Sequence, residues 1–208
     1  TLYYADLQDA LDHASGGTFH FLTPSLNTRL IVPDNVTIDF TNMSLYHDTS
    51  DSELVLSGRV TLLNRETSYA LIQNIPIVVQ SGGTLIVPKN YSISEENQLD
   101  LSSGSSITIE PGGHAELYSG TYSYIYADTD SEIHISDCSN PVLVMKDGSR
   151  AVLTGGSYRS LYLEGICDVK ISGGSYGRIE IYETDLQSAL VRPKVTYADF
   201  SALLTNGS

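Results

Sequence analysis

LVMKDGSRAVLTGGSY (residues 143–158) aligns without a gap on LYLEGICDVKISGGSY (residues 161–176), 18 positions later. The same step backwards reaches IYADTDSEIHISDCSN (residues 125–140) and then ITIEPGGHAELYSGTY (residues 107–122). Four units in one register indicate a single structural unit that is stacked on itself. The repeat therefore decides the fold, whereas it does not by itself decide the function.

The 18 positions of the repeat are numbered here as columns, with Ile107 in column one. Four of these columns are filled by apolar, mostly aliphatic residues. Columns one and three, and again nine and eleven, are apolar and are separated by one mostly polar residue, which is the period of a strand with one buried face. Gly and small polar residues between these pairs are typical of turns, several of which need a positive φ. We expect the core to hold Ile107, Ile109, Ile125, Ala127, Leu143, Met145, Leu161, Leu163, Ala115, Leu117, Ile133, Ile135, Ala151, Leu153, Val169 and Ile171.

Each unit is thus a strand, a turn, a strand, a turn and a corner, and stacking coils about 4.8 Å apart pairs each backbone with the next. A left-handed hexapeptide solenoid needs an aliphatic residue at every sixth position, which this repeat lacks. The Asp that 18-residue Ca²⁺-binding repeats carry in every nonapeptide is missing too. The sequence therefore predicts an all-β fold, a single-stranded right-handed parallel β-helix with ~18-residue coils.

The same pattern is looser towards the N-terminus. IVVQSGGTLIV (residues 77–87) matches ITIEPGGHAEL (residues 107–117), and the surplus between them falls in residues 88–106, as a loop excursion or a pair of irregular coils. LIVPDNVTIDF (residues 30–40) and LVLSGRVTLLN (residues 54–64) indicate further strand-turn-strand pieces. We expect one domain over 1–208 with a cap helix in 1–17, irregular coils in 18–106, regular coils in 107–182 and a cap helix in 196–207.

The expected caps are short amphipathic segments. Leu7, Ala10, Leu11 and Ala14 have helical spacing before a Gly-Gly stop. Near the other end, TYADFSALLTNG (residues 196–207) places its three large apolar residues on one helical face, before a Gly. A stacked fold must cover its last apolar layer and its unpaired strand edge, so helices are expected at both ends.

The segments LQDAL (residues 7–11), SGGT (residues 15–18), VP-x-x-V-x-I (residues 32–38), GGSY (residues 155–158 and 173–176) and LL-x-x-G (residues 203–207) occur in this order. In this succession the chain resembles the β-helical domains of large surface proteins from Gram-positive gut bacteria, within the pectate-lyase-like superfamily. The resemblance implies an exported module of a longer multidomain chain, at the cell surface and anchored to the cell wall through a segment outside this sequence. The start at Thr1, without Met or signal peptide, agrees with a mature or trimmed fragment.

Composition narrows the partners. The 25 acidic and 11 basic residues give a net charge of −14, which argues against nucleic acid or an anionic membrane surface. No apolar run approaches the ~20 residues that span a bilayer, so membrane insertion is not expected. Cys138 and Cys167 fall in different columns of non-adjacent coils, and a disulfide needs Cα atoms within about 7 Å, so we expect two free thiols.

Catalytic and metal-binding signals are sparse, and neither a catalytic residue nor a cofactor is expected. Asp128, Asp130 and Glu132 alternate in the way that the ligands of a Ca²⁺ loop do, but Asp and Ser are also ordinary turn residues, so a solvated turn is favoured and no metal site is predicted. His114 and His134 have no partner that repeats in register and are expected to lie on the surface.

Two further columns form ladders along the stack. Column eight reads His114, Glu132, Arg150 and Asp168, whose alternating charges should pair between coils. Column sixteen reads Tyr122, Asn140, Tyr158 and Tyr176. We expect this second ladder to fill the interior edge of a corner, and the alternative is a platform on which sugars stack.

The outward columns eighteen, two and four suggest a binding surface. They carry four tyrosines, and exposed aromatic residues on a flat parallel sheet suggest recognition, although tyrosine also simply suits β-sheets. The predicted ligand-binding residues are Tyr124, Tyr126, Tyr162 and Tyr182, with Arg178 and Lys146 offering hydrogen bonds at the rim.

These observations favour a non-catalytic adhesion or interaction module that binds a host or bacterial glycoprotein or glycan. The competing hypotheses are a polysaccharide-active enzyme, a lyase or a glycosidase, and a structural spacer. An acidic constellation that repeats in register would favour the enzyme, and the sequence has none.

Overall fold

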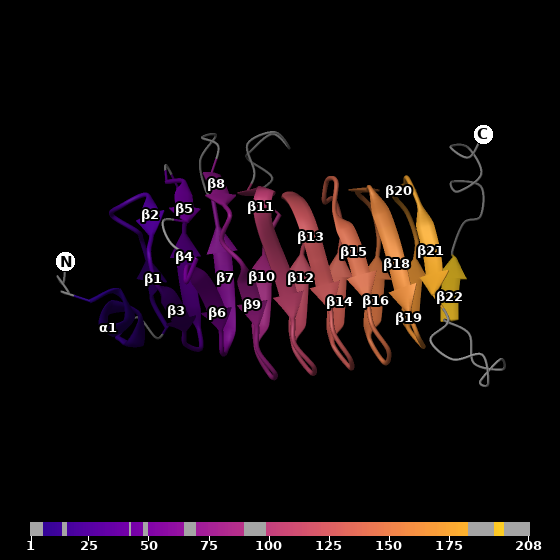
Figure 1. Ribbon diagram of the computed structural model, residues 1–208, viewed down its shortest axis with the longest axis horizontal. Coiled ribbons are helices and arrows are strands. Elements are labelled where there is room, and N and C mark those ends of the chain that lie inside the picture. Colours follow the sequence, from indigo (N-terminus) through magenta and orange to yellow (C-terminus); the bar gives the residue numbers. More distant parts are fainter. Residues whose placement is uncertain are drawn as a thin grey trace.

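Parallel strands and one short helix make up the computed structural model, which describes residues 6–13, 16–41, 43–47, 50–64, 70–89, 99–182 and 194–197. Within each sheet the strands follow one another in chain order along the longest axis of the molecule (Figure 1). The protein is therefore all-β in class with parallel sheets, as the sequence predicts.

Most of the strands belong to one of two long sheets. The first has nine strands, in the order β1 (Thr18–Phe19), β4 (Val36–Asp39), β7 (Arg59–Leu63), β10 (Thr84–Val87), β12 (His114–Leu117), β14 (Glu132–Ile135), β16 (Arg150–Leu153), β19 (Asp168–Ile171) and β22 (Lys194–Tyr197). The main path of the second, eleven-stranded sheet is β2 (Ser25–Leu26), β5 (Leu45–His47), β8 (Ala70–Gln73), β11 (Leu99–Ile109), β13 (Thr121–Ala127), β15 (Val142–Met145), β18 (Ser160–Glu164) and β21 (Ile179–Tyr182).

Shorter elements complete these sheets. The second sheet also contains β3 (Arg29–Val32), β6 (Glu53–Leu56) and β9 (Ile77–Val79), which pair in that order before β9 joins β11. A separate two-stranded sheet pairs β17 (Ser157–Tyr158) with β20 (Ser175–Tyr176). The chain thus alternates between the sheets as it advances along the stack.

The strand register reproduces the sequence repeat. In the second sheet Ile107, Ile125, Leu143, Leu161 and Ile179 are successive partners. In the first sheet Ala115, Ile133, Ala151 and Val169 follow one another in the same way. Each 18-residue step therefore advances the chain by one strand in both sheets at once.

The longer offset near residue 100 is also as expected. Ile77 pairs with Ile107 and Leu85 with Ala115, which is the predicted 30-residue match. Part of the surplus is β11 itself, whose first residues pair with β8 and β13 and whose last residues pair with β9 and β13. At least part of the surplus is therefore paired strand and not a loop, and residues 90–98 lie outside the described part of the chain.

The predicted core is confirmed. All sixteen residues of the four apolar columns are at most 5% exposed, and they belong to one cluster that takes side chains from both long sheets. Burying a Leu or Ile side chain completely contributes about 1.5–3 kcal/mol. The alternation of buried and outward residues along each strand leaves one outer face on each sheet.

A helix, α1 (Leu7–Asp12), lies at the N-terminal end, inside the segment where the sequence predicts one (Figure 1). Asp6 caps it by accepting the backbone N–H groups of Gln8 and Asp9 at 2.7 and 3.2 Å, and Leu11 is fully buried. The Gln8 side chain accepts from the Ile31 N–H and donates to the Ile31 carbonyl, both at 2.8 Å. Gln8 thereby satisfies backbone groups of β3 that face away from its partner β6.

The predicted C-terminal helix needs a correction. We place its start at residue 196, but Thr196 and Tyr197 belong to β22, which pairs with β19. The ladder along the first sheet therefore extends one strand further than the repeat indicates. The remainder of the predicted helix, residues 198–207, lies outside the described residues.

Candidate functional site

The tyrosine face is the outer side of the second sheet from β13 to β21, which carries Tyr124, Tyr126, Tyr162 and Tyr182. Tyr124, Tyr126 and Tyr182 are 41%, 37% and 48% exposed, which is unusual for residues inside strands, whereas Tyr162 is half-buried. Their outward direction follows from the buried inward columns that alternate with them. The structure therefore brings all four predicted tyrosines to one surface.

The strand register sets the spacing of these rings. Tyr126, Val144, Tyr162 and Glu180 are successive partners on β13, β15, β18 and β21. Tyr126 and Tyr162 are thus two strands apart, or about 10 Å. Val144, which is half-buried, lies between them with a much smaller side chain.

The four rings form two pairs. Tyr124 and Tyr126 lie 6.0 Å apart between ring centroids with an interplanar angle of 6°. Tyr162 and Tyr182 lie 6.1 Å apart and are tilted by 31°. The face therefore presents two pairs of neighbouring rings.

The two predicted cations lie at this face, but both contact carboxylates. Lys146 Nζ is 3.4 Å from Asp128 Oδ1, and the Arg178 guanidinium pairs with Glu180. The Tyr182 hydroxyl donates to Glu180, and this bond is the main reason why the pKa of Tyr182 is raised. The carboxylates of the face are therefore as prominent as its cations, which the sequence analysis overlooked.

The column-sixteen tyrosines are buried rather than exposed. Tyr122 and Tyr158 are 1% and 2% exposed, and Tyr158 stacks on half-buried Tyr176 with centroids 4.7 Å apart. The Tyr122 hydroxyl donates to the Ser119 carbonyl at 2.6 Å, and the Tyr176 hydroxyl to that of Gly173 at 3.1 Å. These tyrosines fill the corner, so the alternative of a sugar platform at column sixteen is wrong.

The acidic turn near residue 130 makes contacts within the protein. Asp128 accepts the backbone N–H of Thr129 at 2.8 Å, and this bond, with Lys146 nearby, lowers the pKa of its carboxyl. Asp130 adopts a left-handed turn conformation with φ of 57°. Within the described residues, no group of three or more His, Cys, Asp or Glu side chains is arranged to hold a metal ion.

The outer face of the first sheet carries column eight, but among the described residues only the first of its three predicted charge pairs, His114 with Glu132, lies within 4.0 Å. His114 and Glu132 pair in register and their side chains approach to 3.7 Å, while His114 also lies 3.4 Å from Glu116. Tyr118 adds a contact that the sequence analysis missed, because its ring meets His134 edge-on at 5.3 Å. The spacing of columns eight, ten and twelve, which places alternate residues of one strand on one side, could have revealed this cluster.

Both cysteines are buried and free, as predicted. Burial raises the pKa of the Cys138 and Cys167 thiols above the ordinary value. A thiolate is the reactive form of cysteine, so neither group is poised for nucleophilic chemistry.

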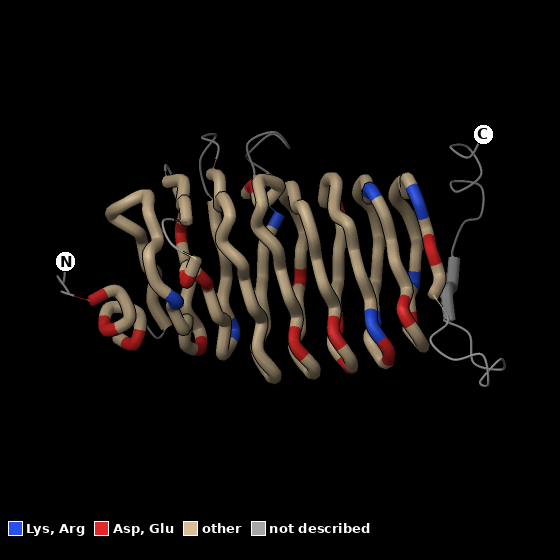
Figure 2. The backbone as a smooth tube through the Cα atoms, in the orientation of Figure 1, with Lys and Arg blue, Asp and Glu red and all other residues tan. Residues whose placement is uncertain are grey.

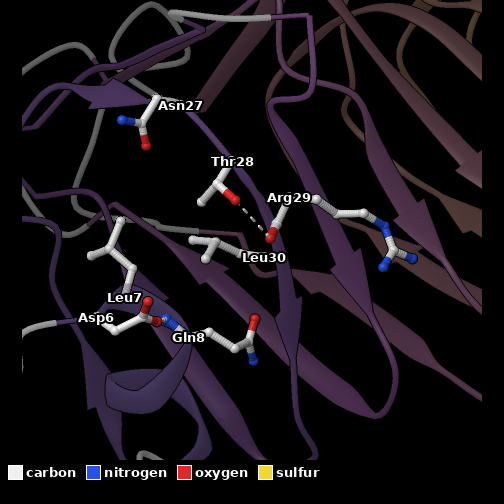
Figure 3. Close-up of a pocket in the computed structure, with 7 residues that line it drawn as sticks. All are labelled: Asp6, Leu7, Gln8, Asn27, Thr28, Arg29 and Leu30. Atoms are coloured by element: carbon white, nitrogen blue, oxygen red, sulfur yellow. Dashed lines mark hydrogen bonds between the residues drawn. The ribbon is translucent and has the colours of Figure 1, made fainter.

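A hollow of about 350 Å³ lies at the N-terminal end, between the start of α1 and the segment that leads into β3 (Figure 3). Arg29 donates through Nε to Glu53 at 2.9 Å, and its side chain points away from α1 (Figure 3). The Gln8 amide is bound to Ile31. The Arg29 and Gln8 side chains of this hollow are thus already bonded to other groups of the protein. We therefore place the candidate site on the tyrosine face.

No protein-family model, no curated protein and no solved structure matches this chain. In the part of the chain that the structure describes, no helix is long and apolar enough to cross a membrane. The functional interpretation therefore rests on the chemistry of the surface.

Proposed function

We propose that this protein is a non-catalytic adhesion or interaction module of an exported bacterial surface protein, and that its tyrosine face binds a glycan or glycoprotein. The observation that carries the proposal is the exposure of Tyr124, Tyr126 and Tyr182 on one stretch of sheet. Tyrosine is one of the residue types in which binding energy concentrates, because its ring is large, stiff and amphipathic.

The proposal includes a finer description of the fold. The two long sheets are two faces of one right-handed parallel β-helix in the pectate-lyase-like superfamily, with α1 as its N-terminal cap. The alternation of the chain between the sheets and the shared apolar cluster support this description. Right-handedness follows the strong preference of parallel crossover connections.

Alanine variants on two surfaces test the binding function. A screen against immobilised host and bacterial glycans and glycoproteins supplies the ligand. Tyr126→Ala and Tyr162→Ala should then each weaken binding by more than about 1 kcal/mol with little effect on stability. His114→Ala and Asp168→Ala, on the first sheet, are the matched controls and should bind as the wild type does.

The same screen separates the competing functions. Normal binding by both tyrosine variants, together with loss of binding in the His114 and Asp168 variants, would move the site to the other sheet. Shortening of a bound polysaccharide by the wild-type protein would favour the enzyme. Absence of binding to any glycan or glycoprotein would favour a structural spacer.

A further inference from the structure

Carboxylates outnumber cations on the tyrosine face. The outward columns from β13 to β21 carry three carboxylates and two cations, namely Asp128, Glu164, Glu180, Lys146 and Arg178. Lys146 contacts Asp128 and Arg178 contacts Glu180, so neither cation is free of a carboxylate. An anionic ligand would have to compete with these ion pairs and would meet the remaining carboxylate, Glu164. The whole chain, at −14, opposes an anionic ligand as well. Figure 2 shows that acidic positions recur along the stack while basic ones are scattered.

The size of the aromatic area suits an oligosaccharide better than a protein. From β13 to β21 there are three strand spacings, about 14 Å, and the outward columns span about 13 Å along a strand. Column eighteen is buried at Val142 and Ser160, so the area is no more than roughly 200 Å². A stable protein–protein interface buries about 800 Å² on each partner. A protein partner would therefore need a much larger part of the molecule than the tyrosines cover.

The spacing of the rings indicates the direction in which a chain of sugars would lie on the face. Tyr126 and Tyr162 lie about 10 Å apart across the strands, with the low Val144 between them. In an extended β-1,4-linked hexopyranose chain successive rings are turned over, and two rings repeat over about the same distance. Such a chain, lying along the long axis of the stack, can place every second sugar on a tyrosine. The apolar C–H face of a pyranose stacks on an aromatic ring, and its hydroxyls can donate to Glu164 and Glu180 in charge-assisted hydrogen bonds.

We propose that the tyrosine face takes a neutral, extended β-1,4-linked hexopyranose chain that lies across β13, β15, β18 and β21. This inference rests on the proposed function and names its ligand class. It excludes uronate-rich and other acidic polysaccharides as the preferred ligand, because the face presents an excess of carboxylates to them.

Pairs of sugars that differ in charge alone test the inference. The probes are cellohexaose and β-1,4-mannohexaose, each compared with its derivative oxidised to the carboxylate at C6. Calorimetry at an ionic strength of about 0.15 M should show at least one neutral hexaose with a Kd below about 1 mM. Its carboxylate derivative should bind at least tenfold more weakly, and this ratio should shrink at about 1 M salt, where the Debye length falls to roughly 3 Å.

Two double variants show which carboxylates discriminate. In Glu164→Gln/Glu180→Gln the neutral hexaose should bind more weakly, because two strong acceptors are lost. The ratio should fall below about threefold, because the Glu164 charge is removed and Arg178 loses the carboxylate that pairs with it. Glu116→Gln/Glu132→Gln carries the same change on the outer face of the first sheet and should keep the wild-type ratio. An unchanged ratio in the first variant would overturn the inference.

The remaining outcomes separate this inference from the proposed function. If the C6-carboxylate sugars bind more tightly and Tyr126→Ala weakens them, the face is a glycan site but the inferred ligand class is wrong. If no hexaose binds while a glycoprotein is held through Tyr126 and Tyr162, the face is a binding site and the inferred ligand class is wrong. If a neutral hexaose binds and neither Tyr126→Ala nor Tyr162→Ala weakens it, the proposed function fails together with the inference.

Discussion

Two groups of tyrosines lie within a few residues of each other and have opposite environments. Tyr122 and Tyr158 fill the corner of the stack and are almost fully buried. Tyr124 and Tyr126, which follow Tyr122 directly, stand on the outer face of the sheet. The residue type is the same, so its chemistry alone does not decide between a core role and a surface role.

The position of each tyrosine relative to the corner determines whether it is buried or exposed. Tyr122 and Tyr124 both belong to β13, and residues two apart on a regular strand would point to the same side. The ladder between β13 and β11 is irregular here, because the partner of Tyr122 is Leu101 and that of Tyr124 is Ser106. The alternation therefore restarts after the corner, with Tyr124 outward and Ile125 inward. A position relative to a corner carries more information than the residue type.

The largest expected effect tests the alternation itself. Leu153 is fully buried and its neighbour Val152 is half-buried on the outer side of β16. Leu153→Asp should unfold the domain. Burying a charge that has no partner costs more free energy than the net stability of a domain. Val152→Asp should remain folded. Circular dichroism and thermal melting measure both, and a Leu153→Asp protein that melts within a degree or two of wild type would contradict the register.

Alkaline pH should also unfold the protein, through the corner. Burial raises the pKa of Tyr122 and Tyr158, so the folded state favours the neutral phenol. The resulting stabilisation is complete below the unfolded tyrosine pKa of about 10 and is lost as the pH rises from there towards the folded pKa.

Phenolate absorbance and circular dichroism, followed together during an alkaline titration, measure this effect. Part of the phenolate signal should appear only as the circular dichroism signal is lost. Complete ionisation of all tyrosines with the sheet signal intact would show that the corner is open to solvent.

Much of the fold can be predicted from the sequence because the repeat encodes the register. An offset of 18 residues fixes which residues pair, and alternation fixes which of them are buried, so Leu153 and Ile171 need no structure to be placed in the core. The end of the regular region is different. A short amphipathic pattern such as that after residue 196 suits a helix or a strand, and here the ladder of β19 continues into β22.

The candidate site is less predictable. The outward direction of Tyr126 and Tyr162 follows from the alternation of the strand. Their exposure does not follow from it, because the ring of Tyr162 lies beside that of Tyr182 and Tyr162 is half-buried. The ion pairs of Lys146 and Arg178 depend on the rotamers of long side chains. Sequence position places such groups on a face and cannot say which neighbour they contact.

Truncation of one ring from each group should give the next largest effect. Tyr122→Ala removes a large buried side chain and should cost about 3–5 kcal/mol, as large-to-small changes of aromatic core residues do. Tyr124→Ala, two residues away, should change the free energy of unfolding by no more than about 0.5 kcal/mol. Urea unfolding measures both values. Equal losses in the two variants would mean that the tyrosine face is a structural element of the sheet.

Removal of single hydroxyl groups within the corner should give the smallest effects. The Tyr122 hydroxyl donates to the Ser119 carbonyl at 2.6 Å, so Tyr122→Phe should cost about 0.5–1.5 kcal/mol. The Tyr158 hydroxyl is buried and has no hydrogen-bond partner among the described residues. Burying an unpaired hydroxyl costs about 1–3 kcal/mol, so Tyr158→Phe should leave the stability unchanged or raise it.

Tyr176→Phe, which loses a longer bond at a half-buried position, should lie between these two variants. The order of the three midpoints in urea is the measurement, since each variant keeps the ring and changes one oxygen. A Tyr158→Phe protein that is clearly less stable than the wild type would show that its hydroxyl is paired, for example through a buried water. The corner would then be held by three hydrogen bonds instead of two, and its contrast with the tyrosine face would be sharper still.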